Sequence, residues 1–223
     1  MITIHIARVV VIAISLAIWF WTQALLGRRA PLSATPDSGL ISDGIHRMTA
    51  RINHKLLDLP RRANALLIGS SLVIDILGFY LLGSAILGPT IQPFLGLFLL
   101  FALRQFCQAF CPLPPPAGTI WRNPGFPSLL VTYGTSSDLF FSGHTAIAVY
   151  AAATMATSFG PIGLIFGLAV ALFEISAVLV LRAHYTMDVF TGAITALYIH
   201  SLAAQWSPAI DAWIAHAATH FIK

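Results

Sequence analysis

Charged residues are scarce in this chain of 223 residues: Asp, Glu, Lys and Arg together make up 9% of it, against about 25% in soluble globular domains. Hydrophobic residues make up 57%, and the mean hydropathy is +0.83. This composition excludes an ordinary soluble domain and predicts an integral membrane protein. The formal net charge of +4 suits anionic lipid head groups. Since no basic run is interleaved with aromatic residues, we expect no binding of nucleic acid.

Cysteine is also rare, because Cys107 and Cys111 are the only two in the chain. Two are too few for a disulfide framework, and their spacing in an apolar segment favours free thiols over a disulfide or a metal site. The first apolar segment lacks a small-residue cleavage motif and is too long for a signal peptide. We therefore expect it to remain as a membrane crossing.

Several apolar segments have about the 20 residues that a helix needs to cross a bilayer. We predict an all-α, polytopic fold, a bundle of six transmembrane helices with crossings at residues 3–26, 64–82, 87–111, 140–159, 162–182 and 186–206. The polar segment 27–62 spaces Ile45, Met48, Ile52 and Leu56 as on one side of a helix, which is typical of an amphipathic helix in the membrane interface. The predicted regions are 1–63 (first transmembrane helix and basic interfacial segment), 64–206 (five-helix catalytic core) and 207–223 (short interfacial tail).

Two histidine-containing motifs flank a long apolar stretch: FSGHT includes His144, and HYTMD includes His184. The sequence between them holds about two crossings of roughly 20 residues each, with a break at Gly160-Pro161 midway. Such a hairpin returns the chain to the face it left, so the two histidines can meet. Asp188 follows His184 by one helical turn. We predict an active site at a membrane surface, with His144, His184 and Asp188 as catalytic residues.

These residue types suit phosphoryl transfer, because imidazole is a good nucleophile and titrates near neutral pH. We expect Asp188 to accept the Nδ1 proton of His184, so that Nε2 can attack phosphorus while His144 protonates the departing oxygen. Ser142 and Gly143 precede a helix, where backbone N–H groups and the helix dipole favour an anion. The alternative explanation is that the two histidine motifs are polar helix ends that have no function in common.

Charges inside a bilayer are costly and are functional hypotheses by default. Asp75, Arg104 and Glu174 fall within predicted crossings. A structural ion pair between Arg104 and one of the acids is one interpretation, and a contact from Arg104 to phosphate is another. A transporter or proton relay through Asp75 and Glu174 is a third, although the paired broken helices of transporters are missing. Arg182, two residues before His184, can offer a forked contact to phosphate oxygens.

The two motifs, in this order and at this spacing, resemble those of the sphingomyelin synthase-like branch of the type 2 phosphatidate phosphatase (PAP2) superfamily. The resemblance extends to Asp138, six residues before His144, and to the Arg104 segment with the following LPPPAG. It covers roughly residues 60–206. It implies a phosphohistidine intermediate on His184, with no metal and no cofactor. The phosphate-binding residues that we predict are Ser142, Gly143, Arg182, Arg104 and Asp138.

The resemblance implies a phospholipid substrate whose head group passes to a lipid alcohol such as ceramide or diacylglycerol. A lipid phosphatase with water as acceptor and a non-catalytic lipid-binding protein are the alternatives. The sequence also departs from the superfamily pattern. Lys55 and Arg62 have the spacing of the classical first motif but no proline follows them, Val178 replaces an arginine, and Ser136 and Ser137 replace the usual cysteine and glycine.

The other histidines are interpreted as surface or interfacial groups, among them His5, His46 and His54. A metal site at Asp211, His216 and His220 is the alternative for the last two in the chain. Two rules disagree on the side of the membrane that holds the site. The basic segment 27–62 places it in the cytoplasm by the positive-inside rule, whereas the resemblance implies an outward or lumenal face. We expect the outward face, because basic residues beside a site for anionic lipids have a second reason to be there.

Overall fold

The computed structural model describes residues 2–27, 41–111, 113–131, 133 and 139–220. Within this part of the chain the fold is all-helical, with seven helices and no strand. They are α1 (Ile2–Gly27), α2 (Gly44–Met48), α3 (Ala50–Asp58), α4 (Pro60–Leu87), α5 (Gln92–Phe110), α6 (Gly143–Val180) and α7 (Thr186–His220). Five of these helices, α1, α4, α5, α6 and α7, are long and apolar enough to cross a membrane. The chain is therefore a multi-pass membrane protein, as its composition predicts.

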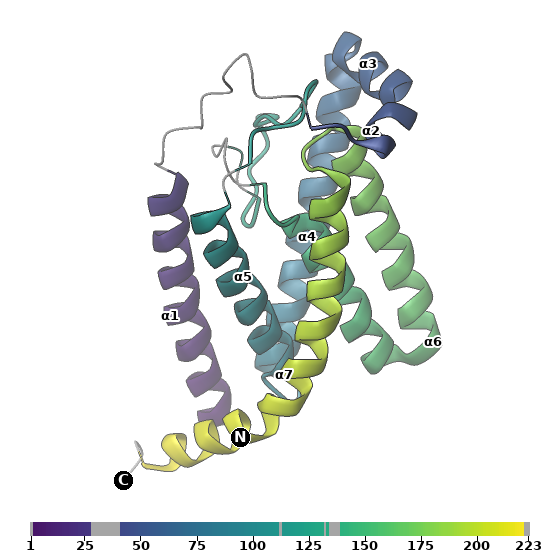
Figure 1. Ribbon diagram of the computed structural model, residues 1–223. Helices are drawn as coiled ribbons and strands as arrows, with labels where there is room; N and C mark the ends of the chain where they lie inside the picture. Colours follow the sequence, from purple (N-terminus) through teal and green to yellow (C-terminus); the bar gives the residue numbers. More distant parts are fainter. Residues whose placement is uncertain (1, 28–40, 112, 132, 134–138, 221–223) are drawn as a thin grey trace.

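Helix α6 is a hairpin rather than one straight helix, as Figure 1 shows. Gly160 has a φ of 61° and a ψ of −141°, which is not helical, and Pro161 follows it. Proline cannot continue a helix because it lacks the backbone N–H, and glycine adopts a positive φ without steric cost. The predicted break at Gly160-Pro161 is confirmed, and it makes the two arms of α6 antiparallel.

The bundle has two distinct ends (Figure 1). The terminal end carries both termini, the α4–α5 turn and the bend of α6. The loop end carries α2, α3, the irregular segment after α5 and the α6–α7 turn. Helix α7 continues through Pro208 to His220, and its last part lies across the terminal end of the bundle (Figure 1). Because α6 reverses at the terminal end, its first and last residues both lie at the loop end.

The polar segment before α4 forms two short helices, divided at Thr49, instead of the single amphipathic helix that the sequence predicts. Ile45 and Leu56 pack against buried residues of the bundle. Met48 and Ile52 are 80% and 53% exposed. The helices thus turn only part of their apolar side toward the protein.

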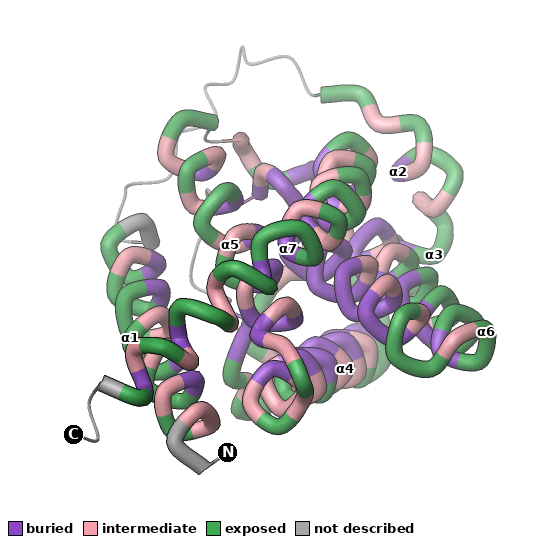
Figure 2. The backbone as a smooth tube through the Cα atoms, turned by 90° about the horizontal axis from the view of Figure 1, so that it is seen from below, coloured by how far each residue is buried: buried purple, intermediate pink, exposed green. Residues whose placement is uncertain are grey.

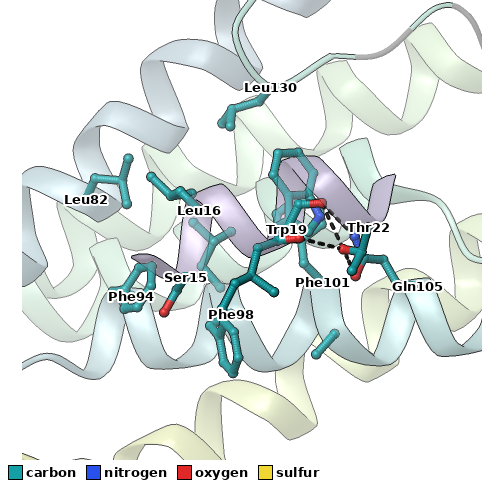
Figure 3. Close-up of a pocket in the computed structure, with 13 residues that line it drawn as sticks. Ser15, Leu16, Trp19, Thr22, Leu82, Phe94, Phe98, Phe101, Gln105 and Leu130 are labelled. Atoms are coloured by element: carbon teal, nitrogen blue, oxygen red, sulfur yellow. Dashed lines mark hydrogen bonds between the residues drawn. The ribbon is translucent and has the colours of Figure 1, made fainter. Parts of the chain in front are cut away.

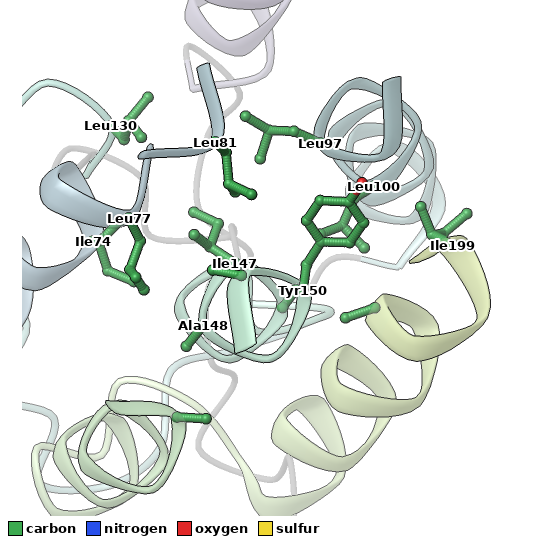
Figure 4. Packing of buried hydrophobic residues seen from close by; sticks show 14 of the residues in the cluster. Ile74, Leu77, Leu81, Leu97, Leu100, Leu130, Ile147, Ala148, Tyr150 and Ile199 are labelled. Atoms are coloured by element: carbon green, nitrogen blue, oxygen red, sulfur yellow. The ribbon is translucent and has the colours of Figure 1, made fainter. Parts of the chain in front are cut away.

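The core lies between α4, α5, the first arm of α6 and α7 (Figure 4). Tyr150 is fully buried there, and its hydroxyl donates a hydrogen bond to the Gln92 carbonyl at 2.9 Å. A Cβ atom at Gly96 would collide with the Tyr150 ring, so glycine is required at this helix crossing. Helix α1 lies at the edge of the bundle and exposes much of its length (Figure 2). It is therefore attached to the other helices at a few places only.

A buried polar cluster at the terminal end provides one such attachment. The Arg8 guanidinium contacts the Asp211 carboxylate at 2.7 Å and the Gly88 carbonyl at 2.6 Å. The same carboxylate accepts hydrogen bonds from Thr90 Oγ1 and the Ile91 N–H. This pairing satisfies a buried arginine and joins α1, the α4–α5 turn and α7. Asp211, part of the alternative metal site, is bound here to protein groups.

Candidate active site

The turn between α6 and α7 is the point on which the loop end converges. Its backbone carbonyls accept four hydrogen bonds from three separate segments of the chain. The donors are Asn53 Nδ2 to Val180 O at 2.9 Å, Ile120 N to Leu181 O at 2.8 Å, Thr119 Oγ1 to Arg182 O at 2.9 Å, and His46 Nε2 to His184 O at 3.0 Å. Helix ends leave carbonyl groups without partners inside the helix, and buried ones must be paired. Helices α2 and α3 and the segment around 119 provide these partners and hold His184 in place.

His46 is buried in this contact, so the expectation that it lies at the surface is wrong. Its ring also packs near that of Tyr185, with centroids 5.9 Å apart. A carbonyl oxygen only accepts hydrogen bonds, so Nε2 of His46 carries a proton. The apolar spacing of the segment gave no signal for this contact, because it depends on where the short helix α2 docks.

The start of α7 is capped by two carboxylates. Asp188 Oδ2 accepts the Tyr185 N–H at 2.9 Å, as the acid of a capping box does. Asp43 accepts the Thr186 N–H and the Thr186 hydroxyl, both at 2.7 Å, and it also caps α2 through the N–H groups of Ile45 and His46. A single side chain therefore joins α2 to the residue two positions after His184.

The His184 ring is oriented by a backbone carbonyl. Its Nδ1 lies 2.8 Å from Leu139 O, while the nearest Asp188 oxygen lies 3.8 Å from the same nitrogen. The expectation that Asp188 accepts the Nδ1 proton is corrected here, because that carboxylate is turned toward the helix cap. Since Leu139 O can only accept, Nδ1 carries the proton and Nε2 of the neutral ring does not. The tautomer needed for attack by Nε2 is thus set by the segment before α6.

His144 lies in the first turn of α6 and is buried. Ser142 caps this helix, and its Oγ accepts the Thr145 N–H at 3.4 Å. The Trp121 ring stands edge-on to the His144 ring, with centroids 5.1 Å apart and planes at 88°. Among the described residues, Nε2 of His144 has no hydrogen-bond partner. A buried polar atom of this kind is unusual and points to a ligand or water.

Both histidine rings line one cavity of about 50 Å³, together with Arg104 and Gly143. The Arg104 Nε donates to the Phe141 carbonyl at 2.9 Å. A Cβ atom at Gly143 would lie 3.1 Å from that nitrogen, so glycine lets the guanidinium approach the start of α6. The rest of the wall is apolar, from Trp19, Ile74, Phe101, Trp121, Leu130, Val131, Leu139, Ile147 and Ala183. The cavity therefore combines two imidazoles and a cation with an otherwise apolar wall. We call it the histidine cavity.

Arg182 and Ser142, which the sequence also predicts for the site, have other partners in the structure. The guanidinium of Arg182 donates to the carbonyls of Ala117 and His46, and Arg182 is not among the residues that line the histidine cavity. Its backbone has a positive φ of 52°. Ser142 contributes a helix cap instead of a cavity wall. Asp138 lies outside the described residues, as do Ser136 and Ser137.

The two acids within the helices bind protein groups. Asp75 accepts the N–H groups of Leu129 and Leu130, both at 2.9 Å. Glu174 is fully buried and accepts the Ser70 hydroxyl at 2.6 Å. These contacts attach the segment near 130 and the second arm of α6 to α4. They place both acids in the packing of the bundle, outside the wall of the histidine cavity.

The wall of the cavity also includes residues that no motif or periodic pattern in the sequence assigns to a site. Trp121, Trp19 and Leu139 come from three segments far apart in the chain. The Trp121 ring packs tilted against that of Tyr133, with centroids 5.0 Å apart, and stands edge-on to that of His144. An aromatic residue in a proline-rich segment gives no periodic signal, so only the docking of that segment identifies it.

The fold and the cavity define a class of protein first: a multi-pass membrane protein with a polar site at one end of an apolar bundle. The model of the AtPDCT1/2 family matches residues 43–205, and the chain belongs to this family. It is a family of phosphatidylcholine:diacylglycerol cholinephosphotransferases, related to the sphingomyelin synthases and to PAP2 enzymes. No curated protein and no solved structure matches the chain. The matched region begins at Asp43, includes the described polar residues of the histidine cavity and leaves out α1.

The double cap by Asp43 yields a prediction on stability. Burial alone would raise the pKa of Asp43, but the hydrogen bonds from Thr186 and His46 outweigh it and hold the pKa below its usual range. A lowered pKa contributes stability above the unfolded value of about 4 and loses it as the pH falls through the folded value. Both Asp43 oxygens accept hydrogen bonds and an amide has only one, so we expect Asp43→Asn to lower the unfolding free energy by about 1–2 kcal/mol at pH 7. The deficit should shrink below about pH 4.

Thermal unfolding of the purified protein in detergent, followed by circular dichroism between pH 7 and pH 3, measures this effect. Asp58→Asn is the matched control, because Asp58 is an exposed acid at the end of α3. A deficit for Asp43→Asn that is the same at every pH would contradict the role assigned to its charge.

Proposed function

We propose that this protein is a phosphocholine transferase that acts on phospholipids and carries the head group on His184. The observation that supports this best is the His184 ring, with Nδ1 hydrogen-bonded to Leu139 O, beside His144 and Arg104 in one cavity. Family membership supports the substrate class, because the AtPDCT1/2 family is one of cholinephosphotransferases. The acceptor in this proposal is a lipid alcohol of the diacylglycerol type.

In the first step, the electron pair of His184 Nε2 attacks the phosphorus of the donor lipid. The bond between phosphorus and the diacylglycerol oxygen breaks, and that oxygen takes a proton from His144 acting as general acid. For this step His144 starts in its protonated form. Diacylglycerol leaves, and phosphocholine remains on Nε2 as a phosphohistidine.

In the second step, His144 takes the proton of the acceptor hydroxyl, and the acceptor oxygen attacks phosphorus. The bond between Nε2 and phosphorus breaks, and its electron pair returns to His184. Arg104 and the start of α6 at Gly143 provide positive potential for the phosphoryl oxygens. Asp188 acts as a charge near the ring, 3.8 Å from Nδ1, and stabilises the positive charge that develops on His184.

Substitutions at His184 and Asp188 separate these roles. His184→Ala removes the nucleophile, and we expect turnover of head-group-labelled phosphatidylcholine to fall to background. Asp188→Asn can keep the cap on Tyr185 through its amide oxygen but loses the charge. At about 4 Å and an effective dielectric constant of about 20, a charge pair is worth about 4 kcal/mol, so the rate should fall by about 10²- to 10³-fold.

The matched control for these variants is Asp58→Asn, because Asp58 is an exposed acid at the end of α3 and does not line the histidine cavity. It should retain turnover within a few-fold of wild type once the amount of folded protein is taken into account. Normal turnover in His184→Ala would overturn the proposed chemistry.

The acceptor is tested by supplying diacylglycerol whose acyl chains differ from those of the labelled phosphatidylcholine. Transfer predicts label in phosphatidylcholine that carries the acceptor's chains. Water as acceptor, the phosphatase alternative, predicts free phosphocholine at a rate that diacylglycerol does not change. A lipid-binding protein without activity would leave the label in the donor, and it would tolerate His144→Ala.

We further propose six crossings, with each arm of α6 counted as one, and a site on the outward face. Six crossings agree with the two termini lying at the same end of the bundle (Figure 1). The exposed basic residues of α2, α3 and the start of α4 lie at the loop end, near a site for anionic phosphates. They are Arg47, Arg51, Lys55, Arg61 and Arg62.

Cys111 reports the side of the membrane, because this free thiol is exposed at the loop end of α5. In intact cells, a thiol reagent that cannot cross membranes should label Cys111 and leave Cys111→Ser unlabelled. Labelling that requires permeabilised membranes would place the site on the cytoplasmic face and overturn the proposed orientation.

A further inference from the structure

A second cavity lies next to the histidine cavity, between α1 and α5 (Figure 3). Its volume is about 140 Å³, and it is called the α1–α5 groove here. The wall consists largely of aromatic and aliphatic side chains, including Leu16, Trp19, Phe94, Phe98, Phe101 and Leu130. Its surface is suited to hydrocarbon rather than to a polar ligand.

The two cavities share part of their walls, because Trp19, Phe101 and Leu130 line both. Trp19 is buried, and its Nε1–H has no acceptor among the described residues. An indole with an apolar body and one free donor suits the ester region of a lipid, where head group and chains meet. The position of Trp19 between a polar and an apolar cavity matches that boundary.

The groove has the length and the opening that an acyl chain needs. Its wall on α5 runs from Gln105 to Phe94, which is about 16 Å of helix. Half of a bilayer's hydrocarbon core is about 15 Å thick. Two wall residues, Ile18 and Phe98, are 54% and 40% exposed, so the groove is open toward the side of the bundle.

Helix α1 is attached on both sides of this opening. Toward the terminal end, Arg8 binds Asp211. Toward the loop end, the Thr22 hydroxyl donates to Gln105 Oε1 at 2.9 Å, and Gln105 Nε2 donates to the Trp19 carbonyl at 3.2 Å (Figure 3). Between these attachments α1 and α5 leave the groove unfilled. The opening is therefore a lateral one, between two helices that are each long enough to cross the membrane.

We propose that the α1–α5 groove holds one acyl chain of the lipid whose phosphate lies in the histidine cavity. This inference rests on the proposed function, because the shared wall at Trp19 places the head group beside the two histidines. The lipid enters laterally from the bilayer between α1 and α5, so that its phosphate does not cross the apolar core of the membrane. Helix α1, which lies outside the region matched to the family, thus takes part in selecting the substrate.

The test fills the groove without touching the histidine cavity. Ser15 lines only the groove, and we expect Ser15→Trp to lower turnover of long-chain phosphatidylcholine by about tenfold or more, because several buried methylene groups lose their place. A short-chain phosphatidylcholine should be turned over at the wild-type rate. Ala17→Trp is the matched control, since Ala17 is exposed on α1 and is not part of the groove.

Photo-crosslinking separates failure of this inference from failure of the proposed function. Vesicles contain phosphatidylcholine with a diazirine near the end of one acyl chain, and mass spectrometry locates the adducts. The inference predicts adducts on groove residues such as Phe94 and Phe98, lost in Ser15→Trp and retained in Ala17→Trp. These adducts in a protein without turnover would support the groove and overturn the proposed function. Equal effects of Ser15→Trp on short and long chains, or adducts unchanged by it, would overturn the groove while leaving the chemistry intact.

Discussion

The need to pair the backbone carbonyls of the α6–α7 turn is the constraint on which the rest of the loop end depends. An apolar hairpin that ends at a membrane surface leaves such groups exposed, and unpaired ones are costly. This protein pairs them with Asn53, Ile120, Thr119 and His46, which come from three other segments. The same contacts determine where His184 lies. The hydrogen bonds that hold the loop end together are therefore the same ones that position the proposed nucleophile.

This arrangement divides the polar groups of the protein by task. Asp43, Asp75, Asp211 and Glu174 each bind protein donors and hold segments together. The histidine cavity instead brings His144 and His184 together with an arginine in a mostly apolar wall. Charges in such a wall act more strongly than in water, because little solvent screens them. The apolar groove beside the cavity completes a site suited to a molecule with one charged and one hydrocarbon part.

Much of the fold could be predicted from the sequence, because it depends on local patterns. Long apolar runs gave the spanning helices, and Gly160-Pro161 gave the hairpin of α6. The hairpin then made it predictable that His144 and His184 share a cavity. The polar segment before α4 forms two helices divided at Thr49 and not one, and His46 was wrongly assigned to the surface. Both differences come from contacts with distant segments, which a helical pattern does not contain.

The sequence by itself determined the class of the molecule, its apolar helices and the meeting of the two histidines, since hydropathy and helix length suffice for these. Only the tertiary structure decided that the Leu139 carbonyl, and not the Asp188 carboxylate, accepts the hydrogen bond from His184 Nδ1. It also decided that the Arg182 side chain binds the Ala117 carbonyl and does not line the histidine cavity. The choice depends on differences of about an ångström and on the direction of single side chains. These distances and directions depend on how separate segments pack against one another. Spacing along the chain shows which residues lie near a turn, but not which of their atoms are in contact.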